Sequence, residues 1–403
     1  MMAAVPTAAL PLEIFVGCLP GLEPFLLREW QALGGGSGDA RLRRGGISFA
    51  GDLTDVYRAN LGLGVASHVL VRLAVLPARY LPRLRAQVEA LPWRDWLGRG
   101  AAVAVRASCQ KSRLYHSGAV AERVAQAIHR ACGADVRVSR AAVQEGPAVL
   151  VRVERDAARV SLDTSGAPLH RRGWRFATGK APLREDLARA LLLASGWEPG
   201  TLLVDPMMGA GTLPIEAALL QSGRPPGGER AFAFEQLLPF AGADLAKVRD
   251  ALAAREVPLV TAEPRIFGSD RDEGAVAAAR ANAARAGVAD AMQFDVAPLA
   301  GAPVLGGALP APAQGAVVSN PPFGRRVGRT DRLGPLYQSL GHLARRLPPT
   351  WRVALCAMDR RLALRTGLPL RTVFLSTHGG AKLRALACGV GDAADAAAAA
   401  ADP

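Results

Sequence analysis

Apolar residues along this chain fall into short runs and helical stripes. After residue 200, strand-like runs at 201–204, 265–269, 291–294 and 316–319 alternate with helical segments. Alternation of this kind is typical of a parallel sheet covered by helices on both faces. The second half of the chain is therefore predicted to be a doubly wound, Rossmann-like α/β domain. Two further runs around residues 378–380 predict an antiparallel hairpin at one edge of this sheet.

The first half of the chain mixes shorter strands and helices, which indicates a small α+β domain ending near residue 165. A basic, turn-rich linker and a helix from about Leu183 to Ser195 then lead into the second half. The elements expected in the first half are a helix with Leu22, Phe25, Leu26 and Trp30 on one face, a strand at 102–107, a helix at about 118–131, and two strands that meet in a tight turn at Asp156-Ala157.

The chain carries a strong positive charge. Its 49 Lys+Arg exceed its 35 Asp+Glu, which leaves a net charge of +14. Only four of the cations are lysines, so 49 − 4 = 45 are arginines, whose planar guanidinium suits phosphates and stacked bases. Binding to a polyanion is therefore expected. The arginine content can equally reflect coding composition, since alanine and glycine are also abundant.

The cysteines and the apolar stretches indicate the cellular compartment and bear on whether a metal site or a membrane-spanning helix is expected. Five widely spaced cysteines, with no CxxC pair and no histidine at ligand spacing, predict free thiols in a reducing compartment and no metal site. The first ten residues do not have the pattern of a secretory signal, so a cytoplasmic protein is expected. The uncharged stretch 296–324 contains several prolines, which exclude a continuous membrane-spanning helix.

The first strand of the second half ends in the stretch DPMMGAGT, which suggests a ligand-binding turn. In open α/β sheets, ligands lie beyond the carboxyl ends of the strands. Asp205 ends the strand, and Gly209 and Gly211 would let the backbone approach a ligand. The stretch is not the G-x-G-x-x-G fingerprint, and a purely structural turn is the alternative interpretation.

A second acidic residue, Asp270, stands at the predicted end of the next strand. A carboxylate there can hold a ribose diol by two charge-assisted hydrogen bonds. Asp270 lies 65 residues (270 − 205) after Asp205, whereas about 20 residues are usual after a dinucleotide-binding glycine loop. The excess is an insert containing GRPPGGERAFAFEQLLPF, so the prediction requires that this insert leave the sheet intact. Asp270 can equally be a helix cap. Asp295, after the third strand, is a weaker candidate for contact with an adenine amino group.

The fourth strand-like run ends in Ser-Asn-Pro-Pro-Phe, residues 319–323. The amide oxygen of Asn320 and a proline carbonyl are two acceptors that could fix both N–H bonds of an exocyclic amine. Such an amine on a nucleobase is a poor nucleophile, so orientation would help attack, while Phe323 would stack on the base. The alternative, an Asn-Pro turn that ends a strand, is less favoured because the glycine loop and Asp270 precede it in the required order.

Together these motifs resemble the class I, S-adenosylmethionine-dependent RNA guanine-N2 methyltransferases that carry an amino-terminal THUMP domain. The resemblance covers nearly the whole chain. The family's opening segment is similar to FVGCLPGLEPFLLREWQALG, and its THUMP segment is similar to RASCQKSRLYHSGAVAERV. The segment that joins the two domains in the family, with the helix that follows it, is similar to LDTSGAPLHRRGWR and APLREDLARALLLASGW. DPMMGAGTLPIEAALL, GSDRD and VSNPPFG are similar to the cofactor and target-amine motifs. The resemblance of the joining segment and of the THUMP segment favours RNA, and not DNA or protein, as the substrate.

The resemblance implies a role for each matching position. Two positions depart from the family pattern: MMGA replaces a stretch where aromatic residues and Cys or Ser are common, and Phe323 stands where tyrosine is frequent. Both bear on stacking strength and not on reaction type. The cofactor, S-adenosylmethionine, would be bound by Asp205, Gly209, Gly211, Thr212, Asp270 and Asp295, and the target guanine would be held by the catalytic residues Asn320, Pro321, Pro322 and Phe323.

The resemblance and the basic charge also predict the partner. The expected substrate is large-subunit ribosomal RNA; a transfer-RNA guanine-N2 methyltransferase, an adenine-N6 methyltransferase and a catalytically inactive RNA-binding or ribosome-assembly protein are the alternatives. Each arginine alone can simply be a solvated charge. Candidate RNA contacts are Lys111, Arg113, Arg171, Arg172 and Arg175. The expected segments are a ferredoxin-like part (11–60), a THUMP RNA-binding domain (61–165), a basic linker (166–180), a class I methyltransferase domain (181–392) and a disordered alanine-rich tail (393–403).

Overall fold

The chain folds into two compact units, neither of which is continuous in sequence. The first unit lies within residues 1–18, 26–169 and 227–254, and the second lies within 19–25, 170–226 and 255–403. Segment 227–254 comes from the predicted insert, so part of that insert belongs to the first unit. The computed structural model describes residues 11–35, 39–139, 146–175, 182–228, 230–240, 244–257, 265–307, 311–323 and 333–389.

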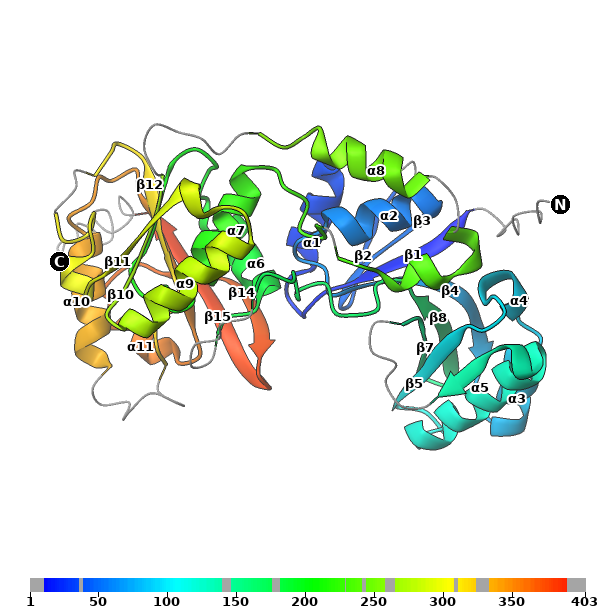
Figure 1. Cartoon of the computed structure of the whole chain (residues 1–403). Helices are drawn as coiled ribbons and strands as arrows, with labels where there is room; N and C mark the ends of the chain where they lie inside the picture. The colour runs from blue at the N-terminus through cyan, green and yellow to red at the C-terminus, as the bar shows by residue number, and fades with distance from the viewer. Residues whose placement is uncertain are drawn as a thin grey trace. The chain divides into compact units, whose positions relative to one another are not determined.

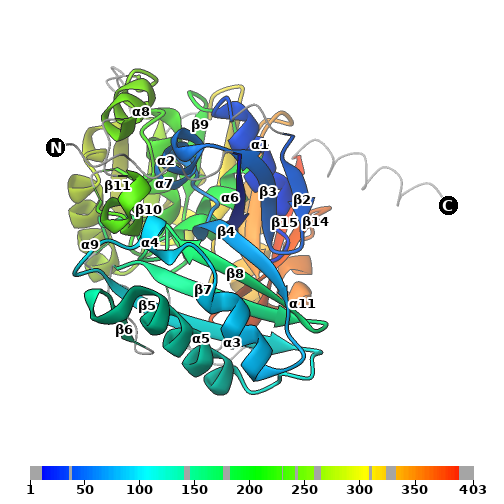
Figure 2. The same ribbon diagram turned by 90° about the vertical axis from the view of Figure 1, so that its right-hand side faces the viewer.

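The first unit is built on one mixed sheet with the strand order β2-β3-β1-β4-β8-β7-β5-β6. Its pairs are antiparallel except β5 with β6 and β5 with β7. Helix α5 packs on β5 and β6, and α3 lies beside α5 and β4 (Figure 2). The strands are β1 (Leu12–Gly17), β2 (Arg41–Arg43), β3 (Gly46–Gly51), β4 (His68–Pro77), β5 (Ala102–Gln110), β6 (Arg137–Ser139), β7 (Ala148–Glu154) and β8 (Ala157–Asp163), and the helices are α1 (Glu23–Ala32), which continues from the second unit, α2 (Leu53–Gly62), α3 (Leu81–Glu89), α4 (Trp93–Trp96), α5 (Ser117–Cys132) and α8 (Asp244–Ala253).

Alternating burial explains why the first segments form this sheet. Along β1, Leu12, Ile14 and Val16 are buried, and the residues between them are more exposed. The predicted apolar face is confirmed for Phe25, Leu26 and Trp30, which are buried within α1, whereas Leu22 is buried just before the helix begins. Trp30 stacks on Phe49 with ring centroids 4.3 Å apart.

The hairpin between β7 and β8 corrects the predicted turn by one residue. Its two central residues are Arg155 and Asp156, whereas Ala157 already belongs to β8. Both central residues have positive φ, 51° and 61°, which is the backbone twist that a two-residue hairpin favours. The tight turn was therefore predicted correctly, but its centre lies one residue earlier.

Segment 227–254 packs on the first unit through aromatic residues. Phe234 lies edge-on to Tyr57 with centroids 5.1 Å apart, and Phe240 does so at 5.5 Å. The hydroxyl of Tyr57 donates to the carbonyl oxygen of Phe240, and the amide of Phe234 donates to the carbonyl of Thr164. Tyr57 and Phe234 are almost completely buried, so this segment completes the core of the first unit.

The second unit confirms the predicted doubly wound sheet, with the strand order β11-β10-β9-β12-β13-β15-β14 (Figure 1). The first five strands are parallel, and β15 joins β13 in antiparallel fashion. Helices α7 and α9 pack on β9, β10 and β11, and α6 packs on β12 and β13. The strands are β9 (Leu202–Asp205), β10 (Ile266–Asp270), β11 (Met292–Val296), β12 (Gly315–Ser319), β13 (Arg352–Ala357), β14 (Arg371–His378) and β15 (Ala381–Gly389), and the helices are α6 (Glu185–Ser195), α7 (Thr212–Gln221), α9 (Glu273–Arg285), α10 (Gly334–Ala344) and α11 (Arg360–Leu364).

Two features that the sequence analysis predicted for this sheet are present. First, β9 and β10 pair in parallel register although the insert lies between them, with Gly268 opposite Asp205. Second, β14 and β15 form the predicted antiparallel edge hairpin, turning at Gly379 and Gly380, whose φ values are positive. Among the described helices, none is both long and apolar enough to cross a membrane.

Candidate functional site

The predicted site residues of the second unit meet at one edge of its sheet. Parallel strands end at the same edge, and here β9 ends at Asp205, β10 at Asp270 and β12 at Ser319. From β9 the chain adds β10 and β11 on one side and then β12 and β13 on the other. The strand order therefore reverses between β9 and β12, which is where open α/β sheets place their ligands.

Asp205 is the buried centre of this edge. Its side chain is only 1% exposed, and its Oδ1 accepts hydrogen bonds from the hydroxyl of Ser319 (2.7 Å) and the amide of Met207 (3.2 Å). The pKa of Asp205 is raised to about 7, mainly by burial and to a smaller extent by nearby Asp270, although the two hydrogen bonds act in the opposite direction. Asp205 therefore changes charge near neutral pH.

The glycine loop, residues 209–211, bends back onto β10 and α9. The amide of Gly209 donates to Oδ2 of Asp270 over 3.0 Å, which joins the loop to the second strand end. Gly211 has φ +82°, and a Cβ there would lie 3.0 Å from the Cβ of Ala279 in α9. A Cβ on Gly268 would lie 2.4 Å from the sulfur of Met208. Glycine at these positions thus permits the close approach of loop, strand and helix.

Asp270 does not cap the following helix. The N-cap of α9 is Asp272, whose Oδ1 accepts from the amide of Ala275 over 3.2 Å. Asp270 instead accepts from the amides of Gly209 and Asp272, so its carboxylate faces the glycine loop. Of the two interpretations left open by the sequence, the helix cap is therefore wrong.

Asp295 lies at the same edge but makes fewer contacts. It is inside β11, opposite Ser269, one residue before the end of the strand, and not after the strand as its sequence position suggested. Its Oδ2 accepts from the side-chain amide of Gln293 over 3.0 Å.

Asn320 follows β12 directly and has an unsatisfied acceptor. Its Oδ1 is buried and has no hydrogen-bond partner among the described residues. A buried amide oxygen without a donor is unfavourable, so the position favours a ligand that brings an N–H group. Pro321 is buried, and Pro322 and Phe323 are half-buried.

Two residues that sequence reasoning missed support this strand end. The hydroxyl of Tyr337, in α10, donates to the carbonyl of Pro322 over 3.3 Å, and Tyr337 is fully buried. Ser319 joins β12 to Asp205. The serine was visible in the motif, but nothing in the sequence connects Tyr337 to Pro322, because a helical face shows only that it is buried and not what its hydroxyl contacts.

In the first unit, Lys111 and Arg113 lie exposed on the loop after β5. The guanidinium of Arg113 lies 5.1 Å from the ring centroid of Tyr80 and donates to its hydroxyl. The loop is fixed by Asp156, which accepts from the amide of Arg113 and from Nε of Arg79. The backbone hydrogen bond from Arg113, followed by the contacts of Arg79, lowers the pKa of Asp156.

The linker arginines divide into one exposed and two internal residues. Arg171 is exposed. Arg172 pairs with Glu216 at 3.3 Å, with side chains 2% and 0% exposed, and Arg175 pairs with Glu185 at 3.0 Å. Burial alone would lower the pKa of Arg172, but Glu216, Glu185 and Asp186 raise it overall. The expectation that Arg172 and Arg175 lie free for RNA is therefore not met: both guanidinium groups are used inside the second unit.

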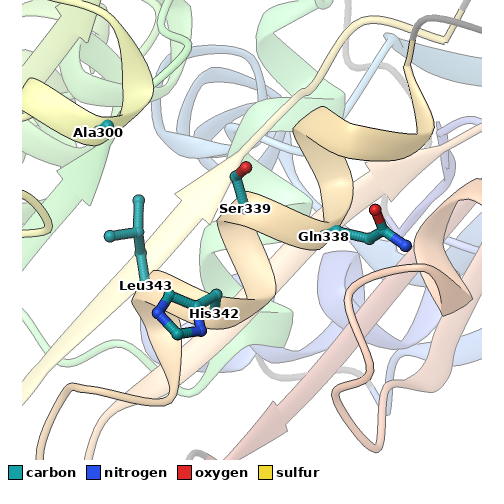
Figure 3. A pocket seen from close by; sticks show the side chains of 5 residues that line it. All are labelled: Ala300, Gln338, Ser339, His342 and Leu343. Atoms are coloured by element: carbon teal, nitrogen blue, oxygen red, sulfur yellow. The ribbon is translucent and has the colours of Figure 1, made fainter.

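One surface hollow of about 360 Å³ lies beside α10. Figure 3 shows Gln338, Ser339 and His342 on one face of this helix. Its lining contains none of the predicted site residues and no carboxylate. Among the described residues, no group of three His, Cys, Asp or Glu side chains is placed to hold a metal ion.

Comparison with known sequences connects this geometry to two families. Residues 172–368 match the family described as RMKL-like, methyltransferase domain, and residues 13–70 match the RlmL ferredoxin-like domain. The ribosomal RNA large subunit methyltransferase K/L of Syntrophotalea carbinolica is 35% identical over 389 residues, which are 93% of this chain and 53% of that protein. The chain thus spans about half the length of this curated relative.

Two solved structures resemble nearly the whole chain. SMU.472, solved in complex with SAH, is 26% identical, with 94% of this chain and 98% of that chain covered and a TM-score of 0.81. A protein from Listeria monocytogenes, described as a predicted N6-adenine-specific DNA methylase, is 29% identical, with 93% and 95% covered and a TM-score of 0.80.

Proposed function

Because residues 172–368 of this chain match the RMKL-like methyltransferase domain, we propose that the protein transfers a methyl group from S-adenosylmethionine to the exocyclic N2 amine of a guanine in RNA. The contact between Ser319 and Asp205 is the observation that carries this proposal. It joins the strand that leads into the glycine loop to the strand that leads into Asn320. A cofactor site on the first strand end and an amine site on the second would therefore be adjacent.

The strand ends carry polar groups that suit the charged and hydrogen-bonding parts of S-adenosylmethionine. The carboxylate of Asp205 and the backbone of the glycine loop would take the methionine end, Asp270 the ribose hydroxyls and Asp295 the adenine amine. Positive φ at Gly209 and Gly211 supports close approach of a ligand to the backbone. When bound, the cofactor would supply a methyl group activated by a sulfonium sulfur. The relative SMU.472 was solved with SAH, which supports this assignment.

The residues 320–323 would hold the target base. Oδ1 of Asn320 and the carbonyl of Pro321 would accept the two N–H bonds of the amine and direct its nitrogen at the methyl carbon. The nitrogen would gain the methyl group as the bond from that carbon to sulfur breaks, with the electron pair left on the sulfur, and would give up one proton to solvent. The hydrogen bond from Tyr337 to Pro322 would keep this turn in place, and the half-buried Phe323 would stack on the base.

Large-subunit ribosomal RNA is the proposed substrate, because the Syntrophotalea relative is named for that activity. Adenine-N6 methylation is the second candidate, since the Listeria relative is described as a predicted N6-adenine-specific DNA methylase. Both reactions need the same two acceptors for an exocyclic amine, so the substrate has to be identified by its product.

Calorimetry with S-adenosylmethionine tests the cofactor assignment, with a matched acidic control. Asp270→Ala is expected to raise the Kd about ten- to a hundredfold, because charged hydrogen bonds to the ribose are lost. Asp272→Ala removes the cap of α9 and should lower the Tm without a comparable change in Kd. Equal effects of both substitutions would contradict the role of Asp270.

Nucleoside mass spectrometry of cells that lack the gene tests the substrate. We expect N2-methylguanosine to disappear from one position of large-subunit ribosomal RNA and to return with the wild-type gene. Its loss from transfer RNA instead would refute the ribosomal assignment, and loss of N6-methyladenine from any nucleic acid would refute the choice of guanine.

A further inference from the structure

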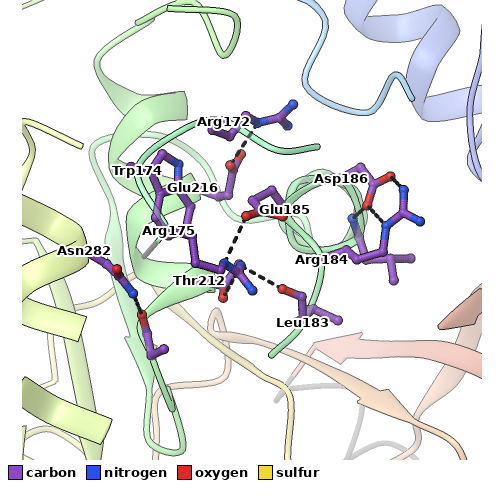
Figure 4. A network of polar contacts seen from close by, with 12 residues as sticks. Arg172, Trp174, Arg175, Leu183, Arg184, Glu185, Asp186, Thr212, Glu216 and Asn282 are labelled. Atoms are coloured by element: carbon purple, nitrogen blue, oxygen red, sulfur yellow. Dashed lines mark hydrogen bonds and ion pairs between the residues drawn. The ribbon is translucent and has the colours of Figure 1, made fainter. Parts of the chain in front are cut away.

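Arg175 connects the linker to the start of α7, the helix that follows the glycine loop (Figure 4). Its Nη2 donates to the hydroxyl oxygen of Thr212 over 2.8 Å and to the carbonyl of Leu183 over 2.9 Å. Its Nε lies 3.0 Å from Oε1 of Glu185. One planar guanidinium therefore holds the linker, the start of α6 and the first residue of α7 together.

A second chain of contacts, made of hydrogen bonds, connects the neighbouring residue, Trp174, to the glycine loop itself. Nε of Arg285 donates to the carbonyl of Trp174 over 3.0 Å, and its Nη2 donates to Oδ1 of Asn282 over 2.6 Å. Nδ2 of Asn282 then donates to the carbonyl of Ala210 over 3.1 Å. The two chains begin at adjacent linker residues and end two positions apart, at Ala210 and Thr212.

Most of the groups in these contacts are buried or partly buried, whereas the side chain of Arg285 is exposed. The side chain of Arg175 is 13% exposed, Trp174 is 5% exposed, and Asn282 is fully buried. The guanidinium of Arg175 also lies 5.3 Å from the ring centroid of Trp174, which restricts its rotation. Hydrogen bonds to buried groups such as Asn282 tolerate little displacement, because a lost partner leaves a buried polar group unsatisfied.

The glycine loop has few side chains with which to fix its own conformation. Two of its three residues are glycines with positive φ. The conformation of the loop therefore depends on hydrogen bonds from neighbouring elements. Three of these involve the carbonyl of Ala210, the hydroxyl of Thr212 and the amide of Gly209.

We infer that Arg175 and Arg285 are positioning residues for the S-adenosylmethionine site, through which the linker sets the conformation of the glycine loop. This inference rests on the proposed function. Neither guanidinium is assigned a contact with the cofactor or the base. Their substitution should weaken cofactor binding by letting the loop leave its binding conformation, and not by removing a contact to the ligand.

A double-mutant cycle between Arg175 and Thr212 tests the first chain of contacts. Arg175→Lys should raise the calorimetric Kd for S-adenosylmethionine about three- to tenfold, because one ammonium group cannot reproduce the contacts of the planar guanidinium with Thr212, Leu183 and Glu185. Thr212→Val removes the acceptor, and Arg175→Lys should then add little further, about twofold or less. Thr212→Ser keeps the acceptor and should restore the full effect of Arg175→Lys. Equal effects of Arg175→Lys in both backgrounds would overturn the inference for this residue.

The second chain and the controls separate positioning from general stability. Arg285→Lys should also raise the Kd severalfold. Arg224→Lys is the matched control, because Arg224 also donates to backbone carbonyls, those of Ala286 and Gly287, but contacts no residue of the loop. It should lower the Tm while leaving the Kd unchanged. If Arg224→Lys weakens the cofactor equally, the effect is structural and the inference is wrong.

Failure of the proposed function would give a different result from failure of this inference. If the wild-type protein does not bind S-adenosylmethionine, the proposed function fails. If the wild type binds it and Arg175→Lys and Arg285→Lys bind it equally well, only the positioning role fails. All titrations belong at a temperature where circular dichroism shows each variant to be folded.

Discussion

Ser319 donates its hydroxyl hydrogen to Asp205 across 2.7 Å, and the two residues are 0% and 1% exposed. They are the last residues of β12 and β9, which lie next to each other in the sheet. The contact therefore fixes the distance between the glycine loop and Asn320. It also places a hydroxyl donor on a carboxyl group that ionises near neutral pH.

Asp205 should make the stability of the free protein depend on pH. Its pKa rises from 3.8 to about 7 on folding, so the folded state holds a proton that the unfolded state has released. This contribution is fully present below pH 4, decreases as the pH rises to about 7, and is lost above that. The Tm of the wild type minus that of Asp205→Asn should follow this course between pH 5 and 8.

Glu185, whose pKa burial also raises to about 7, contributes with the same sign and is cancelled in this difference. Ser319→Ala removes a hydrogen bond that lowers the pKa of Asp205, so it should move the midpoint to higher pH. A difference curve that is flat in pH would contradict the assignment.

Asn320→Ala should lower the rate of methyl transfer by about a hundredfold or more, because one of the two acceptors that orient the amine is lost. The cofactor Kd should stay within about twofold, since Asn320 is assigned to the base and not to the cofactor. Single-turnover assays and calorimetry measure the two quantities separately. Asn320→Asp keeps an acceptor oxygen and should retain more activity than alanine. Full turnover by Asn320→Ala would refute its assignment.

Tyr337→Phe should lower kcat about three- to tenfold, because the carbonyl of Pro322 loses its donor and the turn that holds the amine loosens. Burial raises the pKa of Tyr337, so the hydroxyl remains a donor over the working pH range. The ring is unchanged, and the cofactor Kd should be unaffected. An increase in this Kd with constant kcat would show that the hydroxyl serves the cofactor site instead.

The exposed loop of the first unit should contribute to RNA affinity through charge. Removing Lys111 and Arg113 together should weaken binding and reduce the slope of log K against log salt by about one to two, because up to two phosphate contacts are lost. Arg172→Lys should leave the slope unchanged, since Arg172 is buried against Glu216. Filter binding at several salt concentrations measures both. An unchanged slope in the double variant would exclude these two residues.

The parallel sheet and its strand ends could be predicted because each depends on local sequence. Apolar runs of four to five residues followed by Asp205, Asp270 or Asn320 identify both the strand and the edge on which it ends. The hairpin at Gly379 and Gly380 follows from turn chemistry in the same way.

The roles of the linker arginines could not be predicted, because their partners are distant in sequence. Arg172 meets Glu216, 44 residues away, and Arg175 meets Thr212, 37 residues away. A sequence shows only that these arginines are charged, and solvent exposure is the usual expectation for a charge. Asp270 and Asp272 show the same limit on a smaller scale, since either acid could cap α9 and only the structure shows which one does.

Segment 227–254 makes the protein hard to dissect. A fragment that stops at residue 169 would lack Phe234 and Phe240, and the ring of Tyr57 would become exposed to water. A fragment that starts at residue 170 would carry the same aromatic residues without their binding surface. No single cut of the chain therefore releases both units in intact form, and truncated genes should give aggregation-prone products where point substitutions give soluble ones.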